Sequence, residues 1–263
     1  MQNADAHPID PAIREDIQAR LTQIEHTHAV RILFACESGS RGWGFASPDS
    51  DYDVRFLYVH RLEWYLRIDP QRDVIEEPLT EVLDINGWDL RKALGLLKKG
   101  NATLIEWLSS PVVYRADPVF LADIQAAAEA THRPQNSFHH YFNMGRRTHR
   151  EHLSAPRIRL KKYLYALRPL LAAAWIEQGR GIVPMAFQDL VDALVKDKEL
   201  RRAIDDLIDR KRHVGEAEAA PAIPALQGFI EAEIERLAAI TPPIKEAFDV
   251  GILDRLMVKT VGA

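Results

Sequence analysis

The hydrophobic periodicity of the chain changes once, close to Arg133-Pro134. Before this point, short apolar runs rich in β-branched and aromatic residues alternate with segments of helical spacing, as in an α+β fold. From Ser137 onward, apolar residues recur only at helical spacing, and the breaks fall at prolines and glycines. We therefore predict two domains, an α+β domain over residues 1–134 and an all-helical domain over residues 135–263.

The positions of the helices and strands follow from the same pattern. Asp10-Pro11 predicts the start of a helix that runs to about His26, because aspartate is a good N-cap and proline favours the first helical position. Strands are predicted at 30–36, 51–59, 73–77, 81–86 and 112–114, and Gly87 is expected to end the fourth. Further helices are predicted at 90–99, 103–108, 138–153, 157–178, 186–195, 198–213, 224–240 and 243–258.

Charge and cysteine content narrow the classes of function. The 263 residues are 47% apolar and 27% charged with a formal net charge of −4, so a nucleic-acid partner would require a local basic patch. Cys36 is the only cysteine, which excludes a disulfide framework and a thiolate metal cluster. The first residues lack a secretory signal pattern, and the longest apolar run, 170–176, is far shorter than the roughly 20 residues of a membrane span. We expect a cytoplasmic protein with no membrane partner.

Two acidic residues stand at the start of the second predicted strand. Because strand residues alternate faces, Asp51, Asp53 and Arg55 point to one side of the sheet. The intervening residues can enter a core: Tyr52, Val54, Phe56 and Tyr58. Two carboxylates this close repel each other unless a cation lies between them, and Mg²⁺ prefers carboxylate oxygens together with substrate phosphates. An isolated Asp-x-Asp is, however, more often the solvated start of an edge strand.

A glycine-rich turn favours the metal-binding interpretation. Gly39-Ser40 ends the first predicted strand and stands ten residues before Asp51. Such a turn, opening a helix, offers free backbone N–H groups, and Ser40 adds a hydroxyl, so it can hold phosphate oxygens. Trp43 and Phe45 are expected to pack beneath the turn. Phosphate donors and paired carboxylates on adjacent strands predict a site for a metal–triphosphate complex.

These residues resemble the signature of a known superfamily. Gly39-Ser40, ten residues and Asp51-Tyr52-Asp53 are similar to the signature of the DNA polymerase beta-type nucleotidyltransferases. The segments 50–56, 84–94 and 106–111 resemble a bacterial and phage subfamily linked to RNA repair, and the likeness covers roughly residues 30–180. The resemblance implies an N-terminal mixed sheet with flanking helices and a helical C-terminal domain. It also implies two Mg²⁺ or Mn²⁺ ions, held by Asp51, Asp53 and a third carboxylate on a later strand.

Asp84 is the preferred third carboxylate, because it lies in an apolar strand-like run that leads into a helix. Glu76 and Glu77 on the preceding strand are the competitors, and Asp89 is expected to cap the following helix. In the implied mechanism, Asp51 and Asp53 bridge both metal ions. Asp84 binds the ion that lowers the pKa of the acceptor hydroxyl, and it is also a candidate base.

The helical half begins with a basic segment. Between Gly145 and Arg168, eight lysines and arginines accompany one acid, Glu151. Lys161, Tyr165 and Arg168 form a stripe at helical spacing, which we interpret as facing a cleft between the domains and binding triphosphate or an anionic acceptor. The alternative is a solvated flank with extended side chains. The predicted nucleotide-binding residues are Gly39, Ser40, Arg41, Lys161, Tyr165 and Arg168.

The implied activity is transfer of a nucleoside monophosphate from a nucleoside triphosphate to an acceptor hydroxyl, with release of pyrophosphate. The subfamily and the basic segment favour an RNA end as the acceptor. Short relatives with the same spacing also AMPylate partner proteins, including toxins, so a protein acceptor is the first alternative. A catalytically silent nucleotide-binding module is the second alternative, although its usual mark, the loss of an aspartate, is not found here.

Overall fold

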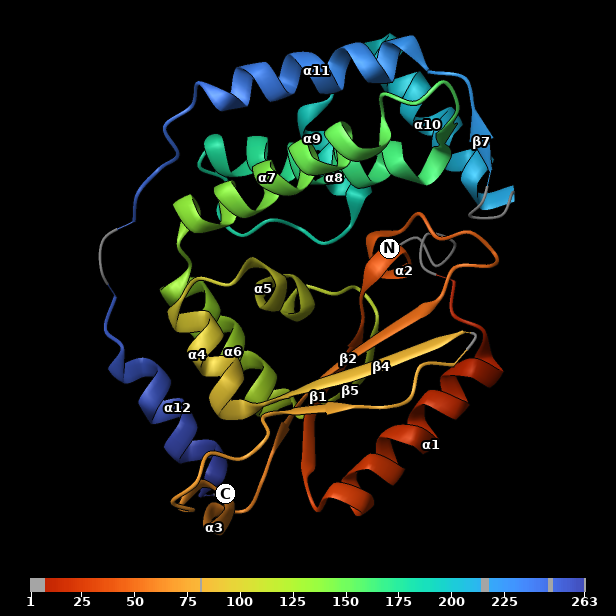
Figure 1. The fold of residues 1–263 in the computed structure, drawn as a ribbon. Helices are drawn as coiled ribbons and strands as arrows, with labels where there is room; N and C mark the ends of the chain where they lie inside the picture. Colours follow the sequence, from red (N-terminus) through yellow and green to blue (C-terminus); the bar gives the residue numbers. More distant parts are fainter. Residues whose placement is uncertain (1–7, 81, 214–217, 246–247, 263) are drawn as a thin grey trace. The chain divides into compact units, whose positions relative to one another are not determined.

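The computed structural model describes residues 8–80, 82–213, 218–245 and 248–262 (Figure 1). The chain forms two compact units, one made of residues 1–42, 51–132 and 246–263, the other of residues 43–50 and 133–245. The passage at His132 to Arg133 lies next to the boundary expected near residue 134. Two segments differ from the expected domains, because 43–50 packs with the helical unit and the C-terminal helix packs with the first unit.

The first unit contains a mixed five-stranded sheet in the order β3-β4-β2-β1-β5. β2 pairs in parallel with β4, whereas the other three pairings are antiparallel. The predicted mixed α+β architecture is therefore confirmed. The strands are β1 (Arg31–Glu37), β2 (Tyr52–Val59), β3 (Val74–Glu76), β4 (Leu83–Asp89) and β5 (Val113–Ala116).

Helices cover both faces of this sheet. α1 lies against one face, and α4 and α6 lie against the other (Figure 1). The helices of this unit are α1 (Pro11–His28), α2 (Gly39–Trp43), α3 (Leu62–Tyr65), α4 (Leu90–Lys98), α5 (Ala102–Leu108), α6 (Pro118–Thr131) and α12 (Gly251–Val261). Among the described residues, no helix has the length and apolar character required to cross a bilayer.

The core of the first unit confirms the predicted alternation along β2. Ile17, Leu21 and Ile24 of α1 pack on the face of the sheet that carries the even-numbered β2 residues. All of these are buried: Tyr52, Val54, Phe56 and Tyr58. Because successive strand residues point to opposite faces, this packing directs Asp53 and Arg55 to the other face. The burial of one face thus fixes which face carries the charged residues.

One expectation in this unit was wrong, and one helix was missed. β4 does not end before Gly87 but continues through it to Asp89. A side chain at Gly87 would place its Cβ 2.2 Å from the Phe56 ring, so the glycine makes room for that ring inside the sheet. Helix α6 was not predicted, although Asp117 caps its N-terminus and Pro118 opens it, which is the same signal that predicted α1.

The second unit is helical, with α8 at its centre. Its helices are α7 (Pro134–His152), α8 (Leu160–Glu177), α9 (Phe187–Leu194), α10 (Lys198–His213) and α11 (Pro224–Ala238). α8 starts later than the predicted residue 157, because Ile158 and Arg159 form strand β6 (Ile158–Arg159), which pairs with β7 (Ala219–Ala220). The helix predicted over 243–258 begins only at Gly251, and residues 246–247 of that range lie outside the described residues.

Candidate functional site

The glycine turn after β1 lies directly against Asp53. The Ser38 amide donates to the Asp53 carbonyl at 2.8 Å, which fixes the turn beside β2. Gly39 has a φ of +56°, and a Cβ added there would lie 1.9 Å from Oδ2 of Asp53. Only glycine fits both the left-handed backbone and this close approach. The Asp53 carboxylate therefore faces the Gly-Ser turn, which is the arrangement a metal–triphosphate site requires.

Asp53 and Asp84 are neighbours on adjacent parallel strands. The register of β2 and β4 pairs Asp53 with Asp84. One nitrogen of Arg55, Nη2, lies 2.9 Å from Oδ1 of Asp53 and 2.7 Å from Oδ2 of Asp84. Both carboxylates are partly buried, with side-chain exposures of 30% and 40%. Two acids at this distance need a cation between them, and here the Arg55 guanidinium supplies it.

The other predicted ligands lie outside this pair. Asp51 precedes the first residue of β2 and is exposed. Glu76 lies on β3, on the far side of β4 from β2, and it contacts Arg72. In the part of the chain that the structure describes, no group of three or more His, Cys, Asp or Glu side chains is arranged to hold a metal ion. The structure thus brings together two of the three predicted ligands, Asp53 and Asp84.

A buried glutamate supports Asp53 from behind. Glu37, the last residue of β1, is fully buried; its Oε1 accepts the Asp53 amide at 2.8 Å, and its Oε2 accepts the Tyr114 hydroxyl. Burial raises the pKa of Glu37 to about 7, although the bonds from Tyr114 and from the Asp53 amide oppose the shift. No role was predicted for Glu37 or Arg55 from the sequence. The sequence signal for Glu37 was an acidic residue at the end of an apolar run, and the signal for Arg55 was a basic residue on the strand face that carries Asp53.

Ser40 and Arg41 follow the turn and are both buried in α2. The Arg41 guanidinium lies 3.8 Å over the Tyr52 ring, and it donates to the carbonyls of Asp51 at 3.3 Å and Pro8 at 3.0 Å. These contacts hold the chain at the entrance to β2, close in sequence to both aspartates. They favour a positioning role for Arg41, and its contact with a nucleotide stays a prediction.

Residues predicted from the helical unit take part in its packing. Arg168 is 1% exposed, donates from Nε and Nη2 to the Met185 carbonyl at 3.3 and 3.1 Å, and lies 4.6 Å over the Trp43 ring. Tyr165 meets the same ring edge-on at 5.3 Å. This burial favours a packing role for Arg168, whereas Tyr165 is only partly buried, and its contact with a nucleotide stays a prediction. Lys161, in the first turn of α8, is only partly buried and stays a predicted ligand.

One further expectation is confirmed and one stays a prediction. Phe45 is fully buried, and its ring packs against Trp43 and against Phe187 of α9, each at 5.6 Å, so the position of these rings beneath the turn stays a prediction. Asp89 caps helix α4, since its side chain accepts the Arg91 amide at 2.8 Å. Asp89 is therefore committed to the helix start.

Comparison with known proteins identifies the family. The chain is 43% identical over 251 residues to the uncharacterized protein YcgL of Bacillus subtilis (strain 168), covering 95% of this chain and 96% of that protein. A crystal structure of a nucleotidyltransferase-like protein from Exiguobacterium sibiricum 255-15 aligns at 13% identity over 94% of this chain and 77% of that one, with a TM-score of 0.30. Residues 13–259 match RlaP, the RNA repair pathway DNA polymerase beta family. The chain belongs to this family of nucleotidyltransferases.

Proposed function

We propose that the chain transfers a nucleoside monophosphate from a nucleoside triphosphate to an acceptor hydroxyl and releases pyrophosphate, in a reaction that depends on a divalent metal ion. The observation that carries this proposal is the approach of the Asp53 carboxylate to the backbone of Gly39. A glycine turn at the start of α2 and a partly exposed carboxylate pair would form the two halves of a metal–triphosphate site.

The carboxylates fit Mg²⁺ or Mn²⁺, because both are oxygen donors and their shared partner is already a cation. Asp53 and Asp84 would hold the ions, with Asp51 completing the set; when bound, two ions would lower the pKa of the acceptor hydroxyl and neutralise the departing pyrophosphate. Gly39 and Ser40 would orient the phosphates. Arg55 would then release its two carboxylates and remain beside the site as a further positive charge.

An RNA end is the proposed acceptor. The family is described by an RNA repair pathway, and the basic segment that begins in α7 offers a local positive surface on a chain with a net charge of −4. A hydroxyl of a partner protein is the alternative acceptor, and a silent nucleotide-binding module is the alternative to an enzyme.

The test is pyrophosphate release by the purified chain with each nucleoside triphosphate, with and without Mg²⁺, and with RNA whose 3′ hydroxyl is either free or blocked. We expect release that requires the metal ion and the free hydroxyl. Asp53→Asn should abolish release while preserving the fold, and Glu76→Gln, which alters a carboxylate on the outer strand, should leave it unchanged.

Two other outcomes of this test would favour one of the alternative functions. No release with any triphosphate and any metal would refute the enzyme and favour the silent module. Labelling of a protein in a cell lysate, with none of the RNA, would retain the transfer reaction and refute the RNA acceptor.

A further inference from the structure

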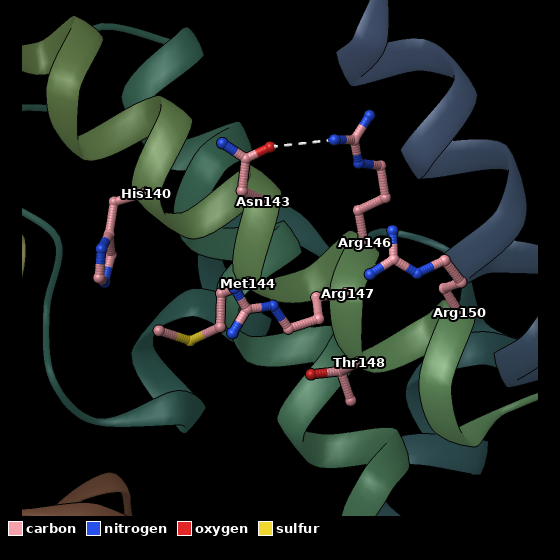
Figure 2. A pocket seen from close by; sticks show the side chains of 7 residues that line it. All are labelled: His140, Asn143, Met144, Arg146, Arg147, Thr148 and Arg150. Atoms are coloured by element: carbon pink, nitrogen blue, oxygen red, sulfur yellow. Dashed lines mark hydrogen bonds between the residues drawn. The ribbon is translucent and has the colours of Figure 1, made fainter.

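Helix α7, in the second unit, carries a pocket of about 720 Å³ (Figure 2). The described residues that line it come from this one helix: His140, Asn143, Met144, Arg146, Arg147, Thr148 and Arg150. Three of these seven are arginines, and none is an acid. The pocket is therefore positively charged, although the whole chain has a net charge of −4.

The protein neutralises little of this charge. Arg147 is exposed, and within the described ranges it has no ion-pair partner. Arg150 lies 3.4 Å from Glu151, but the two side chains are 72% and 47% exposed, so water weakens that pair. Arg146 reaches only the Asn143 side chain at 3.4 Å, while its guanidinium lies 5.5 Å over the Phe142 ring. The guanidiniums remain available to an anion from solution.

The spacing of the three arginines suits a ligand with several negative charges better than a ligand with a single charge. Arg146 and Arg150 are one helical turn apart, about 6 Å along the axis, and Figure 2 shows their side chains next to each other. Like charges at this spacing repel unless an anion lies between them. Arg147 extends beside Met144, away from that pair (Figure 2). The positive charge is thus spread over more than one side of the helix.

We propose that this α7 pocket binds the phosphate backbone of a single-stranded RNA, the acceptor in the proposed function on which this inference rests. Arginine matches phosphate oxygens with two parallel hydrogen bonds, and Asn143 and Thr148 add neutral hydrogen-bonding groups. Among the described lining residues, Met144 is the one apolar side chain, which is too little to insert into a membrane. Because these contacts would involve the phosphates of the RNA and not its bases, we expect binding that is independent of the RNA sequence.

The experiment measures binding of fluorescently labelled single-stranded RNA to the full chain carrying Asp53→Asn, so that no transfer occurs. Three phosphate contacts predict a slope of about −2 for the logarithm of affinity against the logarithm of salt concentration, which is roughly a twentyfold loss from 50 to 200 mM. Arg147→Gln together with Arg150→Gln should lower the slope to about −0.7 and the loss to about threefold. The matched control is Arg202→Gln, an exposed arginine on α10 outside the pocket, which should leave the slope unchanged.

The inference is overturned if the double arginine variant binds RNA with the same salt dependence as the Asp53→Asn protein with all of its arginines, at an unchanged melting temperature. Binding of anionic phospholipid vesicles in place of RNA would overturn it as well. Because binding is measured without catalysis, RNA binding that depends on these arginines would stand even if no transfer activity were found. Conversely, transfer to RNA without such dependence would leave the proposed function intact and remove only this site.

Discussion

Replacing Gly39 by alanine should disable the carboxylate site more than it destabilises the fold. The new Cβ would lie 1.9 Å from Oδ2 of Asp53, and reaching the 3.4 Å of ordinary contact requires a retreat of about 1.5 Å. The alanine would also be held at a φ of +56°, a left-handed conformation that costs about 1–2 kcal/mol. The Asp53 carboxylate would therefore leave both the turn and its 2.9 Å bond to Arg55.

The expected consequences differ in size. The strain should lower the melting temperature by roughly 2–8 °C, whereas a misplacement of about 1 Å in a reacting group costs about a hundredfold in rate. Metal-dependent pyrophosphate release, measured well below the melting temperature, should therefore fall about a hundredfold. Gly95→Ala on α4 is the matched control, because its Cβ would meet nothing within 4 Å and helix interiors favour alanine. If a folded Gly39→Ala variant released pyrophosphate at the wild-type rate, the close approach of Gly39 to Asp53 would not matter for catalysis.

Three further predictions concern the same sheet. Burial raises the pKa of Glu37 in the folded state from 4.5 to about 7, so the folded state holds this proton more tightly than the unfolded state. The free energy of unfolding should therefore fall by about 3 kcal/mol as pH rises from 4.5 to 7. Denaturation measured across this pH range should show the loss in the wild type and not in Glu37→Gln, and parallel pH profiles of the two proteins would contradict the prediction. Asp84→Asn should reduce pyrophosphate release about a hundredfold or more, whereas Glu76→Gln should not; the reverse order would make Glu76 the ligand. Gly87→Ala should lower the free energy of unfolding by about 1–3 kcal/mol, because the new methyl group overpacks against Phe56. Adding Phe56→Leu to this variant should recover part of the loss, and a double variant whose loss equals the sum of the two single losses would refute the contact.

Much of the fold could be predicted because local patterns were decisive. The alternation along β2 predicted which residues enter the core, and burial of Phe56 and its neighbours against α1 confirms it. The Asp-Pro signal predicted the start of α1, and the same signal at Asp117-Pro118 would have predicted α6. Gly87 was misjudged because a glycine inside a strand can accommodate a neighbouring ring, and only the pairing of β2 with β4 shows which ring that is.

The candidate site was less predictable, because it depends on contacts between distant parts of the chain. Asp53 and Asp84 meet through a parallel pairing of β2 with β4, and no local pattern sets this register. The support of Asp53 by Glu37 depends on Tyr114 of β5, on the far side of β1 from β2. Arg168 looked like part of an exposed stripe, yet its guanidinium satisfies the Met185 carbonyl inside the helical unit. Helical spacing alone does not distinguish these two environments.

We propose that the carboxylates facing the Gly-Ser turn hold a divalent ion together with a triphosphate. The most direct measurement is a titration of Mn²⁺ by electron paramagnetic resonance, with wild-type protein and with Asp53→Asn, in the presence of a non-hydrolysable triphosphate analogue. We expect protein-dependent binding of Mn²⁺ in the wild type and its loss in Asp53→Asn, with an unchanged melting temperature. Equal Mn²⁺ binding by both proteins would contradict it.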